Sequence, residues 1–388
     1  MRLASATLMG FLMLGCPQRV EGVPDAGSAE PDAGVDAGTP LADAGLSCPE
    51  YAHEADGGCV TALFWVNAPT GPSPRDHHAT ALVAGDAGVT LLVVNGVDMS
   101  ASAGRFDSWY ARPAADGSFD TWHPGPKPRF FAVGSGVEVW NQFVYVVSGS
   151  TGATNTPRVQ SLQLNDDGTP GTWREEQALP NAGAFHVTTT RVGRWLFALG
   201  GRDANGIAYA NVWRAHIEDD GTLSAWSAAR SFPAPRTHHA SFASGDTLFV
   251  TAGFDNQVGF DNQVGFDDSD DVHYGDVLTA TVDPDTGELS EWASRPLGFE
   301  LSTHSAAVFD GHVFLIGGFD SELRVLDTVR RAKVNDDGTL GAFELMAPLI
   351  KARAHVHNTP IHAGLIYSVG GNTGGHEPIN DVTVGTLY

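Results

Sequence analysis

The chain has 388 residues, of which 42% are hydrophobic, and it contains 46 glycines and 22 prolines. This apolar fraction can fill a core, which excludes a wholly disordered chain, and the many glycines and prolines indicate frequent turns. The chain carries 22 basic against 46 acidic side chains, a net charge of −24, so nucleic-acid binding and adsorption to an anionic membrane surface are excluded as expected roles.

The first segment has the features of an export signal. Residues 1–15 hold one charge, Arg2, followed by an apolar run that is too short to anchor the chain across a bilayer. The segment ends in Met13-Leu14-Gly15-Cys16 and resembles a bacterial lipoprotein signal, which implies that Cys16 carries a lipid. The alternative is an ordinary cleaved signal, with Cys16 removed or left free.

Two short segments follow the signal. Residues 16–45 repeat Asp-Ala-Gly four times without apolar periodicity, which predicts a disordered tether. Residues 46–60 contain Cys48 and Cys59, and an exported chain meets an oxidising compartment, so we expect a disulfide-closed loop. A metal-binding cysteine pair is the alternative. No cysteine occurs in residues 60–388.

The rest of the chain, residues 61–388, contains six repeats. A short β-rich apolar run ends in a small residue or asparagine and then glycine six times, and the closing glycines are 53, 52, 52, 65 and 53 residues apart. Such runs predict strands that are buried on both faces. The six closing residues are Gly96, Gly149, Gly201, Gly253, Gly318 and Gly371.

A second signature lies between these runs. An Asp-Gly turn precedes an aromatic residue in four repeats, as in Asp167-Gly168 before Trp173, and a fifth repeat has a longer variant before Trp292. Asp-Gly between strands predicts a hairpin, so each repeat is expected to form four strands, with the aromatic filling the gap between sheets. Residues 61–65 look like a lone fourth strand that completes the last repeat and closes a ring.

These features resemble kelch-type β-propellers of the bacterial, galactose-oxidase-like superfamily. The resemblance implies an all-β fold, a six-bladed propeller over residues 61–388 closed by its N-terminal strand. Copper chemistry of the galactose-oxidase type needs a cysteine within the propeller, and none is present. The sialic-acid mutarotases, also six-bladed, are the closest enzyme analogy.

Basic and histidine residues recur before the first strand of the repeats, where loops of one propeller face meet near the axis. They are candidate ligand-binding residues, or a metal or acid–base site, and the alternative is that they hydrogen-bond loop carbonyls. The candidates are Arg75, His78, Arg129, His186, Arg236, His239, His304, Arg353 and His357. Strand alternation predicts that His77, His238 and His355 face the other way.

The fourth repeat has a long loop at residues 254–271, in which a six-residue unit is duplicated before an acidic run. This loop is the best candidate for contact with a partner. Its carboxylates also suggest calcium as a cofactor, although a duplicated, solvated acidic loop explains them equally; no other cofactor is expected. The calcium candidates are Asp267, Asp268, Asp270 and Asp271.

Together these patterns predict a monomeric, lipid-anchored protein of the cell envelope, at the outer membrane or the cell surface. Its propeller face is expected to bind a protein or glycan without catalysis, and its lipid to be its only membrane contact. The alternative is a sugar-acting enzyme such as a sialic-acid mutarotase-like epimerase, for which the sequence identifies no acid–base pair.

Overall fold

A computed structural model describes residues 52–55, 58–98, 101, 103–255, 272–374 and 377–388, with side chains described from residue 62 onward. Every regular element in these ranges is a strand, and none of the described residues forms a helix long and apolar enough to cross a membrane. Several predictions fall outside the described residues: the signal at 1–15, the tether at 16–45, lipidation of Cys16, the Cys48–Cys59 disulfide, and calcium at Asp267, Asp268, Asp270 and Asp271.

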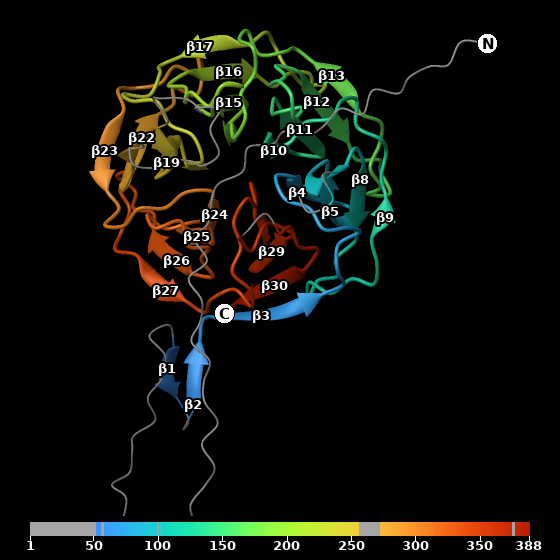
Figure 1. Cartoon of the computed structure of the whole chain (residues 1–388), viewed down its shortest axis with the longest axis vertical. Coiled ribbons are helices and arrows are strands. Elements are labelled where there is room, and N and C mark those ends of the chain that lie inside the picture. The colour runs from blue at the N-terminus through green and yellow to red at the C-terminus, as the bar shows by residue number, and fades with distance from the viewer. Residues whose placement is uncertain (1–51, 56–57, 99–100, 102, 256–271, 375–376) are drawn as a thin grey trace, which may run out of the picture.

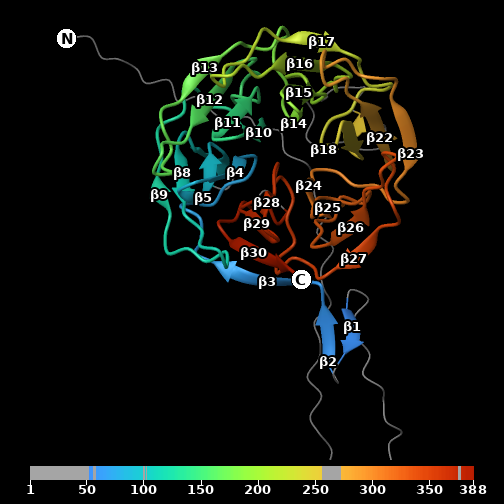
Figure 2. The same cartoon turned by 180° about the vertical axis from the view of Figure 1, so that it is seen from behind.

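Six four-stranded antiparallel sheets surround a central axis, which confirms the predicted six-bladed propeller (Figure 1, Figure 2). The first three blades are β4 (Ala79–Gly85), β5 (Gly88–Val94), β8 (Ser108–Ala111) and β9 (His123–Pro124); β10 (Gly136–Trp140), β11 (Phe143–Val147), β12 (Val159–Gln163) and β13 (Arg174–Glu176); and β14 (Thr188–Val192), β15 (Trp195–Leu199), β16 (Val212–His216) and β17 (Ser227–Ala229).

The other three blades complete the ring. They are β18 (Ala240–Ser244), β19 (Thr247–Thr251), β22 (Asp276–Thr281) and β23 (Ala293–Pro296); β24 (Ser305–Phe309), β25 (His312–Ile316), β26 (Val329–Lys333) and β27 (Glu344–Met346); and β28 (Ile361–His362), β29 (Leu365–Val369), β30 (Val382–Leu387) and β3 (Leu63–Ala68). Three two-stranded hairpins lie outside the blades: β1 (Ala52–Ala55) with β2 (Gly58–Thr61), β6 (Val97–Asp98) with β7 (Ala103–Gly104), and β20 (Phe254–Asp255) with β21 (Val272–His273).

The ring is closed by the strand predicted to close it. β3 pairs antiparallel with β30 along its whole length, from Leu63 opposite Leu387 to Ala68 opposite Val382. Leu63 is fully buried and Trp65 is 7% exposed, whereas Phe64 between them is 54% exposed. One face of the closing strand therefore packs into the core, and the open sheet edge between the two ends of the propeller disappears.

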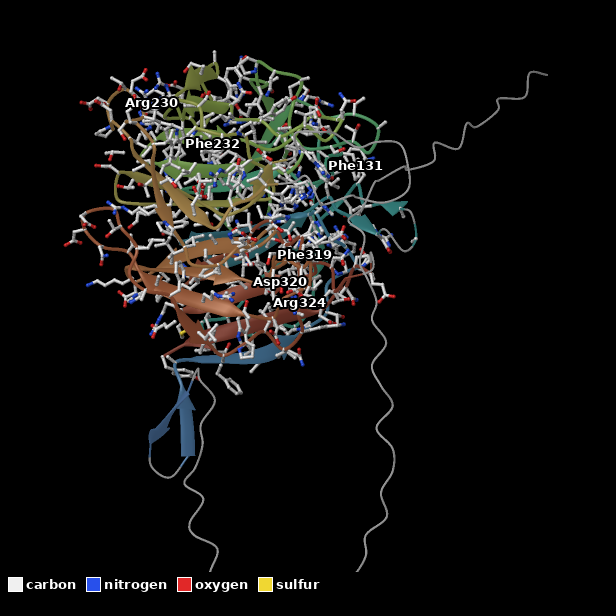
Figure 3. The ribbon with its side chains drawn as sticks, turned by 60° about the vertical axis from the view of Figure 1, so that its left-hand side comes forward. Phe131, Arg230, Phe232, Phe319, Asp320 and Arg324 are labelled. Carbon is white, nitrogen blue, oxygen red and sulfur yellow. The ribbon has the colours of Figure 1, made fainter. Side chains whose placement is uncertain are left out.

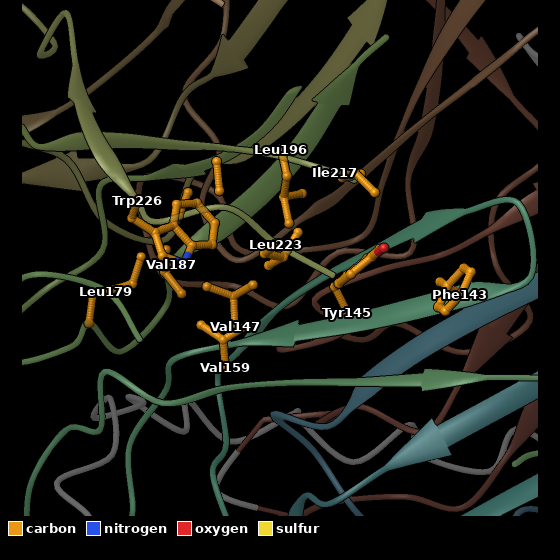
Figure 4. Close-up of a cluster of buried hydrophobic side chains, with 13 residues drawn as sticks. Phe143, Tyr145, Val147, Val159, Leu179, Val187, Leu196, Ile217, Leu223 and Trp226 are labelled. Carbon is orange, nitrogen blue, oxygen red and sulfur yellow. The ribbon is translucent and has the colours of Figure 1, made fainter. Parts of the chain in front are cut away.

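Adjacent blades pack together through one aromatic residue per repeat, at the position that the sequence predicts. Trp122, Trp173 and Trp226 immediately precede the outer strands of their blades, and each lies in the buried cluster shared with the preceding blade. Figure 4 shows the cluster around Trp226. Each of these indoles also donates to a main-chain carbonyl of the preceding blade or its outgoing connection, as Trp226 does to Gln177 at 2.8 Å. The recurring aromatic thus combines apolar burial with a satisfied N–H donor.

Candidate functional site

The segments that lead into the first strand of each blade meet around the propeller axis. At the same position in every blade, one residue after an isolated β-bridge, the backbone adopts a positive φ of 50–60°. Histidine tolerates this left-handed conformation better than most side chains, and glycine adopts it without strain. The six residues are His77, Gly134, His186, His238, Thr303 and His355.

Main-chain hydrogen bonds join several of these residues to the equivalent residue of the neighbouring blade. The N–H of Gly134 donates to the carbonyl of His77 at 2.8 Å, and the N–H of His186 donates to Gly134 at 2.9 Å. The N–H of His77 reaches the carbonyl of His355 at 3.1 Å, which links the first blade to the last. Gly134 is required in the second blade, because a Cβ there would lie 2.3 Å from the ring of Phe185.

The left-handed backbone directs four imidazoles to the axis, where His357 joins them. The ring centroids of His186 and His238 are 3.6 Å apart, those of His77 and His355 are 4.3 Å apart, and His357 lies 4.9 Å from His186. Two groups of three bring their ring nitrogens within 4.8 Å of one another: His77, His186 and His357, and His186, His238 and His355. We call these five residues the axial histidine cluster.

Three members of the cluster, His186, His238 and His357, are neutral at physiological pH. Burial is the largest cause that lowers the pKa of His186, His238 and His357 well below the usual range. Neighbouring imidazoles lower these pKa values further, because one protonated ring disfavours a second. Neutral imidazoles keep a lone pair available as an acceptor or as a metal ligand.

A buried carboxylate orients one member of the cluster. Asp76 is fully buried, and its Oδ1 lies 2.8 Å from Nδ1 of His77. Asn372 donates to the other oxygen of Asp76 at 3.0 Å. This contact places the proton of His77 on Nδ1 and leaves Nε2 as the acceptor or ligand atom.

The structure separates the predicted histidines into two sets. Of those proposed to line the axis, His186 and His357 do so, whereas His78, His239 and His304 are buried between blades. Nε2 of His239 lies 3.0 Å from the hydroxyl of Thr188, and that of His304 lies 2.8 Å from Thr251. Burial as the largest cause lowers the pKa of His78, His239 and His304 to about 3.

The predicted orientation of His77, His238 and His355 is wrong, because these residues face the axis. The prediction assumed that side chains alternate as in an extended strand. A left-handed residue breaks this alternation and turns its own side chain inward. The constant spacing Arg-x-His, at Arg75, Arg236 and Arg353, was the sequence signal that marks the equivalent histidines.

The arginines of the Arg-x-His spacing have a structural role, because their guanidinium groups are buried and bonded within the blade. Arg75 and Arg236 are 2% and 1% exposed and pair with the carboxylates of Asp107 and Asp276 at 2.8 and 3.0 Å. Arg353 is equally buried and donates to the carbonyl of Gly370 at 3.1 Å. Each guanidinium thus ties strands and loops of its own blade together. Arg129 is exposed and lies outside this arrangement.

The connections between the second and third strands carry several carboxylates. Asp320 accepts from Nε of Arg324 at 2.7 Å within the loop that begins at Phe319 (Figure 3). Asp203 accepts main-chain N–H groups of its own turn, and Asp98 pairs with Arg105 at 2.5 Å. These carboxylates stabilise their own loops. Residues 256–271 of the long fourth loop, and His376, lie outside the described residues.

A channel extends along the axis from the cluster. It is a cavity of about 460 Å³, bounded by the innermost strands β10, β14, β18 and β24 and by residues 357–361. His357 belongs to its lining, so the channel adjoins the axial histidine cluster. Its other polar lining residues are Ser135, Glu138, Thr188, Thr189, Thr190, Arg191, Ser241 and Asn358. Sequence reasoning identified none of these, because strand residues facing a channel have the same alternation as residues facing a core.

One ionisable pair stands out in the channel. Burial is the largest cause that raises the pKa of the Glu138 carboxyl, while the N–H of Val139 and the charge of Arg191 oppose the rise. The carboxylate accepts from the main-chain N–H of Val139 at 2.9 Å. Nε of Arg191 donates to the carbonyl of Val139 at 3.2 Å. The channel therefore offers hydroxyls, one carboxyl and one guanidinium.

Comparison with known proteins supports the architecture alone. No protein-family model matches the chain, and no curated protein matches it in sequence. Among solved structures, one titled "Structure of YjhT" is similar with a TM-score of 0.60 and 13% sequence identity, over 81% of this chain and 95% of that chain. At this identity the likeness shows the propeller fold and leaves the kelch-type assignment and the function as expectations.

Proposed function

We propose that this chain is a lipid-anchored protein of the cell envelope that binds a glycan in its axial channel without catalysis. The observation that carries the proposal is the polar channel of about 460 Å³. Its volume is within the range of small-molecule sites, which span about 300–1,000 Å³. The predicted signal, Cys16 and tether supply the envelope location as part of the same proposal.

The lining suits a polyhydroxylated ligand. Serine and threonine hydroxyls both donate and accept, a carboxylate accepts, and a guanidinium donates, so together they match sugar hydroxyls in either role. The hydroxyl of Thr189, a residue 8% exposed, has no hydrogen-bond partner among the described residues. A ligand hydroxyl could form a hydrogen bond with this group, which has already lost its contact with water.

The arginine and histidine candidates of the loop face contribute less to this proposal than the sequence suggested. Arg75 and Arg236 are occupied by carboxylates of their own blades, and His239 and His304 by threonine hydroxyls. We therefore propose the channel, and not the loop face, as the binding site.

Binding is favoured over sugar chemistry by the number of carboxyls. Glu138 is the one carboxylate among the described residues that line the channel. Acid–base catalysis at a sugar ring needs a proton donor and an acceptor on opposite sides of the reacting carbon or hydroxyl. A single carboxyl beside Arg191 suits recognition, and the epimerase alternative would need His357, whose pKa burial lowers well below the usual range, as its second proton-transferring group.

The test is a thermal-shift titration of the full chain with sialic acids, hexoses and envelope-derived glycans. A ligand that binds only the native state raises the melting temperature in a saturable way. We expect Glu138→Gln to weaken this effect and Glu300→Gln, at an exposed position, to leave it unchanged. Saturable stabilisation that is unaltered in Glu138→Gln would place the ligand elsewhere, and turnover of a bound sugar would establish the enzyme alternative.

A further inference from the structure

We infer that His77, His186 and His357 form a binding site for a late first-row transition-metal ion such as Zn²⁺, next to the axial channel. This inference goes beyond the proposed glycan binding and does not depend on it. Three imidazoles from three different blades converge here, with one nitrogen of each within 4.8 Å of the other two.

The geometry needs little adjustment to bind an ion. An ion placed centrally among three atoms separated by at most 4.8 Å lies at most about 2.8 Å from each, and Zn–N bonds are about 2.0–2.1 Å long. Movements of less than about 1 Å at each ring, within reach of side-chain rotation, therefore complete the site. Three imidazoles select zinc, copper or nickel over calcium, which prefers oxygen ligands.

Two independent features of the surroundings point to a ligand. Asp76 is fully buried and holds Nδ1 of His77, which directs Nε2 of that ring to the axis. Metal-binding histidines almost always have such a second partner on their other nitrogen. Nδ1 of His186, a residue 2% exposed, and Nε2 of His357 have no hydrogen-bond partner among the described residues. A buried nitrogen without a hydrogen-bond partner costs free energy, unless a ligand binds to it.

The choice between the two overlapping triads follows from access. His186 belongs to both. All three members of the second triad are buried, whereas His77 and His357 of the first triad are partly exposed. His357 instead lines the channel, which gives the first triad an open fourth coordination position for water or a channel ligand.

The test is titration of the chelator-treated full chain with Zn²⁺, and with Co²⁺, whose visible absorption reports its coordination. We expect one ion per chain. His357→Gln and His186→Asn should each weaken binding by at least about 10-fold, because loss of a ligand costs at least as much as loss of its outer partner. Asparagine suits the left-handed backbone at position 186, so this variant keeps the main-chain hydrogen bond to Gly134.

The matched control is His238→Asn, which makes the same change at an equivalent left-handed position of the same buried cluster. It should bind the ion within about 3-fold of the unchanged chain, and melting curves without metal confirm that each variant is folded. Absence of binding by the unchanged chain overturns the inference. Binding that survives His357→Gln but is lost in His238→Asn also overturns it, because the ion then belongs to the other triad.

Discussion

The histidines between the blades make the propeller sensitive to acid, and His304 allows the effect to be calculated. This residue is 3% exposed, and its Nε2 lies 2.8 Å from the hydroxyl of Thr251. Burial is the main cause that lowers the pKa of His304 from 6.5 to about 3. Because the unfolded chain binds the proton more readily, the stabilisation is complete above the unfolded pKa of 6.5. It is lost progressively as the pH falls toward 3.

The size of the effect follows from these two pKa values. Between pH 8 and pH 5, protonation of unfolded His304 lowers the free energy of unfolding by about 2 kcal/mol. His304→Gln keeps a group that can bond Thr251 but removes the titration. The loss of stability between pH 8 and pH 5 should therefore be about 2 kcal/mol smaller in the variant than in the unchanged chain.

The assay is urea unfolding of both proteins at the two pH values. Comparing the change with pH, instead of stability itself, cancels the packing cost of the substitution. His123→Gln is the control, because His123 is exposed, and it should retain the pH dependence of the unchanged chain. An equal loss of stability in His304→Gln and the unchanged chain would refute the assignment of His304 as a buried neutral residue.

Three further predictions concern the closing strand, the buried ion pairs and the tether. Trp65→Ala should lower the free energy of unfolding by about 3–5 kcal/mol, because it empties a core site and removes the hydrogen bond from the indole to the carbonyl of Ala347. Phe64→Ala, on the exposed face of the same strand, should lower it by less than about 1 kcal/mol in the same urea experiment. Arg236→Met should lower the free energy of unfolding by about 3–5 kcal/mol, because Asp276 loses its buried partner. Arg324→Met, in an exposed pair with Asp320, should lower it by less than about 1 kcal/mol. Equal losses of stability would contradict the structural role of Arg236. Cys16→Ser should move the protein from the membrane to the soluble fraction of exporting cells and abolish labelling with a fatty acid, and continued labelling would disprove lipidation at Cys16.

Much of the fold was predictable because its signals are local and repeated. Glycine-ended apolar runs, Asp-Gly turns and one aromatic per repeat specify a blade, and each recurs at the expected place. A lone closing strand was predictable because the last repeat lacks a partner for its final strand, although it spans Leu63–Ala68 and not the predicted residues 61–65. Repetition makes such signals reliable, since an error in one repeat is corrected by the others.

The site was less predictable because it depends on backbone conformation and on residues far apart in sequence. The left-handed φ of His77, His238 and His355 reverses the side-chain direction that simple alternation assigns. Glu138 and Arg191 come from different blades, and nothing in either strand marks a residue that faces a channel instead of a core. The ion pair of Arg75 with Asp107, 32 residues away, likewise exists only after the blade has folded.

The most direct test of the proposed function fills the channel. Ala307 on β24 belongs to its lining, and Ala307→Phe places a ring in the channel, whereas Ala228→Phe makes the same change on the exposed outer strand β17. The measurement is ligand-induced thermal stabilisation of the full-length protein with the glycan panel. We predict saturable stabilisation of the unchanged chain and of Ala228→Phe, and none of Ala307→Phe. Stabilisation that persists in a folded Ala307→Phe variant, or is absent from the unchanged chain for every glycan, would contradict binding in the axial channel.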